Sequence, residues 1–112
     1  MYIFDIKFKN EKIASIRLNQ EEGTFEGELY TDEVFKLPFF PPITYEKIFC
    51  FIRSRCFDRG RPDSRRILDV LGVEEYNVYD IARATHGVSY RDCLWMEFPG
   101  DNLTWEEVKV RD

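Results

Sequence analysis

The sequence is poor in histidine and holds only one, His86, among its 112 residues. A Cys–His nucleophilic pair would need this imidazole beside Cys50, Cys56 or Cys93, and no motif in the sequence pairs them. A zinc site from these four residues can be counted, but no two cysteines have C-x-x-C spacing. We therefore expect no metal and no catalytic residue. We interpret His86 as lying at the C-terminal end of a helix, where a positive charge favours the helix dipole.

Cysteine is also scarce, with three residues and no export signal at the N-terminus. An odd number of cysteines without such a signal is typical of reduced thiols in a cytoplasmic protein. Cys50 falls on the apolar stripe of an expected helix. We predict that all three thiols are free and that Cys50 is buried and slow to react.

Long apolar runs and phosphate-binding glycine loops are absent too. No stretch could span a bilayer, and Gly60 stands alone without a nucleotide-binding motif. Glu106 and Glu107 are adjacent on an expected helix, where neighbouring side chains diverge, so they make a poor acid–base pair. We expect no membrane span, no cofactor and no enzymatic activity.

Aromatic residues, in contrast, are abundant: ten Phe, six Tyr and two Trp. Because each buries a large area, a chain of this length can build one core, and we expect residues 1–112 to form a single domain. Residues 2–30 alternate between apolar and polar in three runs separated by turns. This pattern predicts a three-stranded antiparallel meander. In its third strand the residues expected to face inward are Phe25, Gly27 and Leu29, and those expected to face outward are Glu26 and Glu28.

Three short helices are predicted between residues 43 and 87, where apolar residues recur at three- and four-residue steps. The expected boundary residues are Thr44, Pro62-Asp63 and Asn77 at the N-termini, and Gly72 and Gly87 at two C-termini. Ile81 and Ala84 should face inward from the third helix. Residues 94–98 indicate a late strand, and a capping box over residues 104–107 predicts a final helical turn. The expected fold class is α+β.

Residues 79–92, YDIARATHGVSYRD, look like the centre of a helix-turn-helix. That motif needs a second helix of several turns in the major groove. Only nine residues separate Ser89 from Pro99, and the last five favour a strand that is too apolar to face DNA. A helix with a glycine C-cap, followed by a turn and a strand, explains the stretch better.

The same region carries a T-x-G-x-S-x-x-D-x-x-W pattern, formed by Thr85, Gly87, Ser89, Asp92 and Trp95. Upstream lie RSR at 53–55, PDSR at 62–65 and LGVEEY at 71–76, and ELYTDEV at 28–34 precedes them. This order resembles a small module found beside HipA-like kinases, and as separate short proteins, in Gram-positive bacteria and their mobile elements. The resemblance covers residues 28–107 and departs at 56–61, where the link is longer. It implies no catalytic residues, and no kinase nucleotide-binding motif is present.

The strongest local signal is the arginine segment, residues 53–66, in which six of fourteen residues are arginine. Two aspartates oppose them, so the segment carries +4 and the rest of the chain −9. Guanidinium groups bind carboxylate or phosphate in a bidentate manner. The arginines could pair with acidic residues of this chain, bind a protein partner, or contact nucleic acid, which the net charge of −5 disfavours. They are Arg53, Arg55, Arg59, Arg61, Arg65 and Arg66.

An acidic pole opposes the arginine segment. Its members are Glu21, Glu22, Glu26, Glu28, Asp32 and Glu33. A surface with two poles suits electrostatic docking onto a charged protein, and an acidic sheet face can present carboxylates where the phosphates of DNA would sit. Either pole could be the binding surface.

These observations lead to three functional hypotheses. The first is a non-enzymatic interaction module of phage or mobile-element origin that binds a host protein, in its sharpest form an inhibitor of a defence nuclease, as anti-CRISPR proteins are. The second is an accessory partner of a HipA-like kinase, and the third is a nucleic-acid-binding regulator that uses the arginine segment. The sequence leaves the oligomeric state open.

Overall fold

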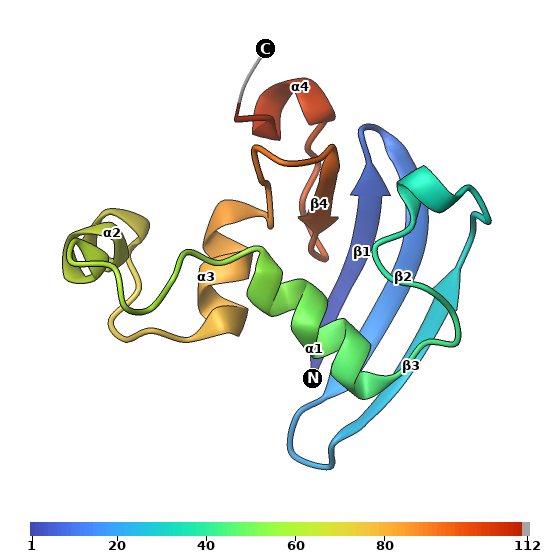
Figure 1. Ribbon diagram of the computed structural model, residues 1–112, viewed down its shortest axis with the longest axis horizontal. Coiled ribbons are helices and arrows are strands. Elements are labelled where there is room, and N and C mark those ends of the chain that lie inside the picture. Colours follow the sequence, from blue (N-terminus) through green and yellow to red (C-terminus); the bar gives the residue numbers. More distant parts are fainter. Residues whose placement is uncertain (111–112) are drawn as a thin grey trace.

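Four strands form one antiparallel sheet in the computed structural model, which describes residues 1–110. The strands are β1 (Tyr2–Phe8), β2 (Glu11–Asn19), β3 (Thr24–Leu29) and β4 (Leu94–Glu97). Their order is β3-β2-β1-β4, and every neighbouring pair is antiparallel. The predicted α+β class, the N-terminal meander and the late strand are confirmed. β4 completes the sheet beside β1 (Figure 1).

One face of the sheet carries the core, because apolar residues alternate along each strand. Phe4 of β1 and Ile16 of β2 are register partners and are both buried. Ile6 pairs with Met96 of β4 on the same face. After Ile6 the register shifts by one residue, which leaves Ile13 without a partner on β1, although its side chain is buried.

The helices are α1 (Tyr45–Ser54), α2 (Ser64–Leu71), α3 (Val78–Thr85) and α4 (Trp105–Val108), with a 3-10 turn η1 (Val34–Lys36) after the meander. α1 crosses in front of the sheet, α3 lies beside β4, and α2 lies farthest from the sheet (Figure 1). Ile48 and Ile52 of α1 and Ala82 of α3 join the core. No helix within residues 1–110 is long and apolar enough to cross a membrane.

Capping residues set the helix ends, largely as predicted. The Thr44 side chain accepts a backbone N–H from the first turn of α1, and the Asn77 side chain accepts two from α3. Gly72 ends α2 in the left-handed conformation, with φ of 75°. The capping box of α4 joins Thr104 to Glu107, which confirms the structural interpretation of that carboxylate.

Two details of α3 differ from the prediction. The C-cap of the helix is His86, one residue before the predicted Gly87; the φ of His86 is 55° and that of Gly87 is 62°. The inward residues are Ile81 and Ala82, whereas Ala84 is exposed. Ala82 belongs to the main core and Ile81 is buried outside it, because α3 lies between the sheet and α2 and is covered on two sides (Figure 1).

The prediction of a buried Cys50 is wrong, since this residue is exposed. Ile48, Phe51 and Ile52 make the buried side of α1. Position 50 lies about 200° around the helix from position 48, and so points away from the core.

Trp95 is fully buried, but on the sheet face opposite to Met96. Its register partner is Lys7, whose Nζ lies 5.4 Å from the centre of the indole ring. The indole Nε1 donates a hydrogen bond to the Lys9 carbonyl oxygen at 2.6 Å. Trp95 therefore packs against the outer face of the sheet, while Leu94, Met96 and Phe98 are buried in the main core.

Candidate interaction surface

The most buried arginine of the arginine segment is Arg55, whose side chain is 7% exposed. Its Nη1 and Nη2 donate to the two carboxylate oxygens of Asp92, at 2.8 and 2.6 Å. Nη1 also donates to the carbonyl oxygens of Gly87 and Leu94, and the guanidinium lies 4.8 Å from the centre of the Phe51 ring. Arg55 thus ties the end of α1 to the loop before β4 and contributes little to the surface.

The ion pair also affects the carboxyl of Asp92. Burial acts to raise the pKa of Asp92, but the hydrogen bonds and positive charge of Arg55 outweigh burial and hold the pKa below its ordinary value. The carboxylate is therefore ionised at neutral pH. It also accepts the backbone N–H of Leu94 at 3.1 Å, which fixes the start of β4.

Two further arginines of the segment pair with nearby aspartates. Arg61 binds Asp63 through two nitrogens at 3.0 Å, and Arg65 binds Asp69 at 2.7 Å. Both pairs are exposed, so each contributes at most about 1 kcal/mol to stability. Their charges are nevertheless largely balanced within the chain.

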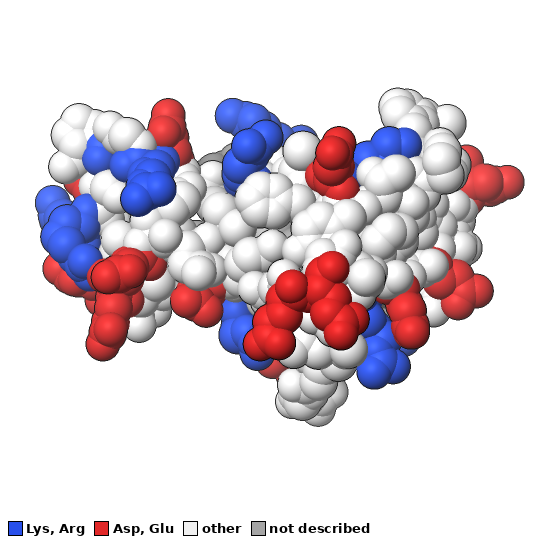
Figure 2. Space-filling model, turned by 90° about the horizontal axis from the view of Figure 1, so that it is seen from below, with Lys and Arg blue, Asp and Glu red and all other residues white. Residues whose placement is uncertain are grey.

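The remaining three arginines, Arg53, Arg59 and Arg66, have no ion pair within residues 1–110. Arg53 lies over the Phe49 ring and Arg59 over the Tyr76 ring, at 5.8 and 5.7 Å from the ring centres. In Figure 2, which looks up from below the view of Figure 1, the end of the molecule that carries α2 shows basic and acidic side chains intermixed. The structure therefore divides the predicted arginine surface into one buried residue, two paired residues and three exposed cations.

The T-x-G-x-S-x-x-D-x-x-W residues have structural contacts in this fold. The hydrogen bonds run from Gly87 N to Thr85 Oγ1 (3.3 Å), from Arg91 N to Ser89 Oγ (3.1 Å), from Arg55 to Asp92, and from Trp95 Nε1 to the Lys9 carbonyl. Gly87 is also required by space, since a Cβ there would lie 2.7 Å from Met96 Sδ. The pattern thus describes how α3 turns into β4.

No hydrogen bond joins His86 to a cysteine in the described part of the chain. The His86 Nδ1 lies 3.3 Å from the Asp101 carboxylate. Burial raises the pKa of the Cys56 thiol to about 11, so this sulfur is a poor nucleophile. Within residues 1–110 no group of three or more His, Cys, Asp and Glu residues is placed to hold a metal.

The acidic pole centres on β3. Glu26 and Glu28 are exposed on the outer face of the sheet, as predicted, and neither has an ion pair within residues 1–110. Elsewhere on this face the charges are balanced: Lys12 pairs with Asp5, and Lys7 with Glu97. On β3 itself, Glu26 lies opposite Arg17 of β2, whereas Glu28 lies opposite the uncharged Ser15. The negative charge without a basic cross-strand neighbour is therefore that of Glu28. In Figure 2, acidic side chains gather below the middle of the molecule, with basic side chains on either side of them.

Exposed apolar side chains follow β3 directly, and sequence reasoning missed them. Within residues 1–110, eight large hydrophobic residues are exposed, and four of them lie between positions 30 and 40: Tyr30, Val34, Phe35 and Phe40. Phe35 is 72% exposed although its ring contacts Phe8. The available signal was a group of aromatic residues that fits neither a strand nor a helix pattern, next to two prolines.

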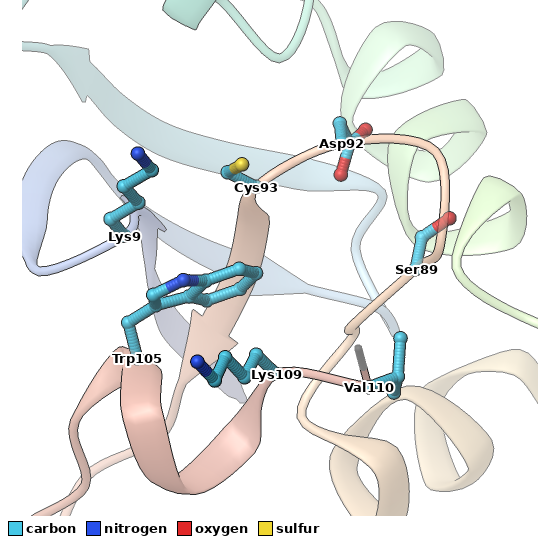
Figure 3. A pocket seen from close by; sticks show the side chains of 7 residues that line it. All are labelled: Lys9, Ser89, Asp92, Cys93, Trp105, Lys109 and Val110. Atoms are coloured by element: carbon cyan, nitrogen blue, oxygen red, sulfur yellow. The ribbon is translucent and has the colours of Figure 1, made fainter. Parts of the chain in front are cut away.

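Two hollows flank the helices. An apolar groove of about 570 Å³ runs between α1 and residues 38–39, with the exposed Cys50 at its wall. A second hollow, of about 320 Å³, lies where α4 meets the loop before β4 (Figure 3). In it Trp105 lies between Lys9 and Lys109, and Asp92 lies on the other side. The charges there are mixed, so neither cation nor anion binding is favoured.

In comparisons with protein-family models, curated proteins and solved structures, none matches this chain.

Proposed function

We propose that this protein acts by binding another protein, through β3 and the segment that follows it, and not by catalysis. The observation that carries this proposal is that Glu26 and Glu28, which are exposed and form no ion pair within residues 1–110, are followed along the chain by exposed apolar side chains at Tyr30, Val34 and Phe35. Protein interfaces combine an apolar centre with a polar rim, and grouped exposed hydrophobic residues mark such sites.

The charge of this chain favours a basic protein over a nucleic acid as the partner. A net charge of −5 and an acidic strand repel phosphates, whereas three of the six arginines are already bound to carboxylates of this chain. A protein with a basic surface complements β3. In the sharpest version the partner is a host defence nuclease, and the carboxylates of this surface occupy its nucleic-acid groove. The phage or mobile-element origin in this version is supported by the sequence resemblance alone.

A HipA-like kinase is the alternative partner. The T-x-G-x-S-x-x-D-x-x-W pattern favours it, because that order of residues resembles the module found beside such kinases. The contacts of these residues are internal. The pattern therefore supports the kinase partner through the sequence resemblance only, and not through an exposed binding surface.

Affinity capture tests the proposal. Immobilised wild-type protein, a Glu26→Lys/Glu28→Lys variant and an Arg59→Glu/Arg61→Glu variant are incubated with lysate of a Gram-positive bacterium, and retained proteins are identified by mass spectrometry. The expected result is one specific protein that the wild type and the arginine variant retain and the glutamate variant loses. Tight, salt-dependent binding of the wild type to duplex DNA would instead support the nucleic-acid hypothesis and overturn this one.

A further inference from the structure

We propose that the free edge of β3 accepts an extended, basic segment of the partner protein as a fifth strand of the sheet. This inference rests on the proposed function and specifies its binding mode.

The hydrogen-bond register shows which backbone groups of β3 are unpaired. The Tyr30 N–H donates to the Ile13 carbonyl oxygen at 2.8 Å, and the register continues along β2 and β3 without a shift. Hydrogen-bonded and non-hydrogen-bonded pairs alternate in an antiparallel ladder. The backbones of Phe25, Gly27 and Leu29 therefore point away from β2. Their three N–H and three C=O groups have no partner within residues 1–110.

The edge is also accessible. β3 is the last strand of the sheet, and in Figure 1 only coil, the segment between η1 and α1, is drawn past it. Gly27, at the centre of β3, is exposed. A Cβ at this position would lie 3.1 Å from the Ile16 side chain and 3.4 Å from that of Ile43, so these two residues cover the inner face at Gly27 and the exposed part is its backbone. An open strand edge of this kind is a template for another strand.

Charge decides between a second copy of this chain and a different partner. If two β3 strands paired antiparallel about Gly27, Glu26 of each would face Glu28 of the other. Like charges directly opposite each other destabilise strand pairing. Glu26 and Glu28 therefore disfavour self-association and favour lysine or arginine on the same face of an added strand. On the other face the partly buried Phe25 and Leu29 favour apolar residues.

The occupant is thus an extended segment in which basic and apolar residues alternate. Main-chain hydrogen bonds supply affinity in such strand addition, and alternate side chains supply specificity. The probe is a synthetic peptide of alternating lysine and valine with the length of β3. In antiparallel pairing its valines lie opposite Phe25, Gly27 and Leu29, and its lysines lie beside the glutamates.

Residue-resolved amide hydrogen exchange provides the readout. In the free protein the amides of Phe25, Gly27 and Leu29 should exchange rapidly, because they are unpaired, whereas those of Glu26 and Glu28 are protected by β2. Saturation with the peptide should slow the first set at least about tenfold and leave the second set unchanged. A uniform effect, or none, would overturn the inference.

Two N-methylated peptides of identical composition serve as matched probes. Methylation of the valine amides removes the donors that face β3 and should weaken binding at least about tenfold, whereas methylation of the lysine amides, which face solvent, should change it little. Equal binding of both would show that attraction is only electrostatic, which refutes strand addition and leaves the acidic-surface function standing. The opposite outcome is also distinguishable. If the peptide adds to β3 but the captured partner still binds the Glu26→Lys/Glu28→Lys variant, the proposed function is refuted and strand addition is not.

Discussion

At the scale of single residues, the hydrogen-bonded ion pair between Arg55 and Asp92 connects two parts of the chain that are far apart in sequence. The guanidinium is almost fully buried and donates to a carboxylate and two carbonyl groups. A buried charge that loses its partner is costly, because water cannot replace the lost contact.

Asp92→Asn should therefore destabilise the protein by about 3 kcal/mol in urea unfolding at pH 7. The matched control is Asp69→Asn, which removes an exposed partner of Arg65 and should cost under about 1 kcal/mol. Equal losses for the two variants would contradict the role given to Arg55.

The same variant has a defined pH dependence. The folded-state pKa of Asp92 lies below its unfolded value, so its stabilisation is complete above the unfolded pKa of about 4 and is lost as the pH falls through the folded pKa. The difference in unfolding free energy between wild type and Asp92→Asn should thus shrink as the pH drops below about 4. A difference that stays constant down to pH 2 would exclude this ion pair as its source.

The cysteines should differ in reactivity. Cys50 is exposed, whereas Cys56 is partly buried, has a pKa raised to about 11 by burial, and points its sulfur toward the carbonyl oxygens of Ile52 and Val78. Thiol titration of the native protein with a disulfide reagent near pH 8 should modify Cys50 first and Cys56 last. Mass mapping that shows Cys56 modified before Cys50 would contradict this placement.

At the scale of elements, the turn from α3 into β4 depends on Gly87. This residue has positive φ, and an added Cβ would lie 2.7 and 2.8 Å from Sδ and Cγ of Met96. Positive φ alone costs an alanine about 1 kcal/mol, and overpacking of the core adds about 1–3 kcal/mol.

Gly87→Ala should accordingly lose about 2–4 kcal/mol of unfolding free energy. Gly72→Ala is its control, since Gly72 also has positive φ but no atom within 4 Å of the added Cβ. That control should lose only about 1 kcal/mol. Equal losses of unfolding free energy for the two alanine variants would contradict the close approach of Gly87 to Met96.

The outer side of β4 is held by Trp95. Trp95→Ala should cost about 3–5 kcal/mol, because it removes a fully buried ring. Trp95→Phe keeps much of the ring but removes the donor to the Lys9 carbonyl, and should cost about 1–3 kcal/mol. Chemical denaturation of both variants measures the two losses of unfolding free energy. An unchanged denaturation midpoint for Trp95→Ala would contradict the burial of the Trp95 side chain.

At the scale of the whole molecule, local patterns predicted the elements well. Strand alternation placed β1, β2 and β3, and the capping residues Thr44, Asn77 and Gly72 marked helix ends, because each of these signals acts over a few neighbouring residues. The pairing of β4 with β1 was not predictable, since partner choice depends on contacts far apart in sequence.

The interaction surface was harder to predict for the same reason. Arg55 looks like its neighbours in sequence, and only the fold brings Asp92 to it. Cys50 lies on an apolar stretch, but helix rotation turns it outward. Glu26 and Glu28 were correctly placed outward, because strand alternation alone decides their face.

The measurement that tests the central claim most directly is the affinity of the captured partner for the two charge-reversed variants, compared at physiological salt with the wild type. The account predicts at least about tenfold weaker binding for Glu26→Lys/Glu28→Lys and nearly unchanged binding for Arg59→Glu/Arg61→Glu, with both variants folded. Full affinity in the glutamate variant together with loss in the arginine variant would contradict the account and return the binding surface to the arginine segment.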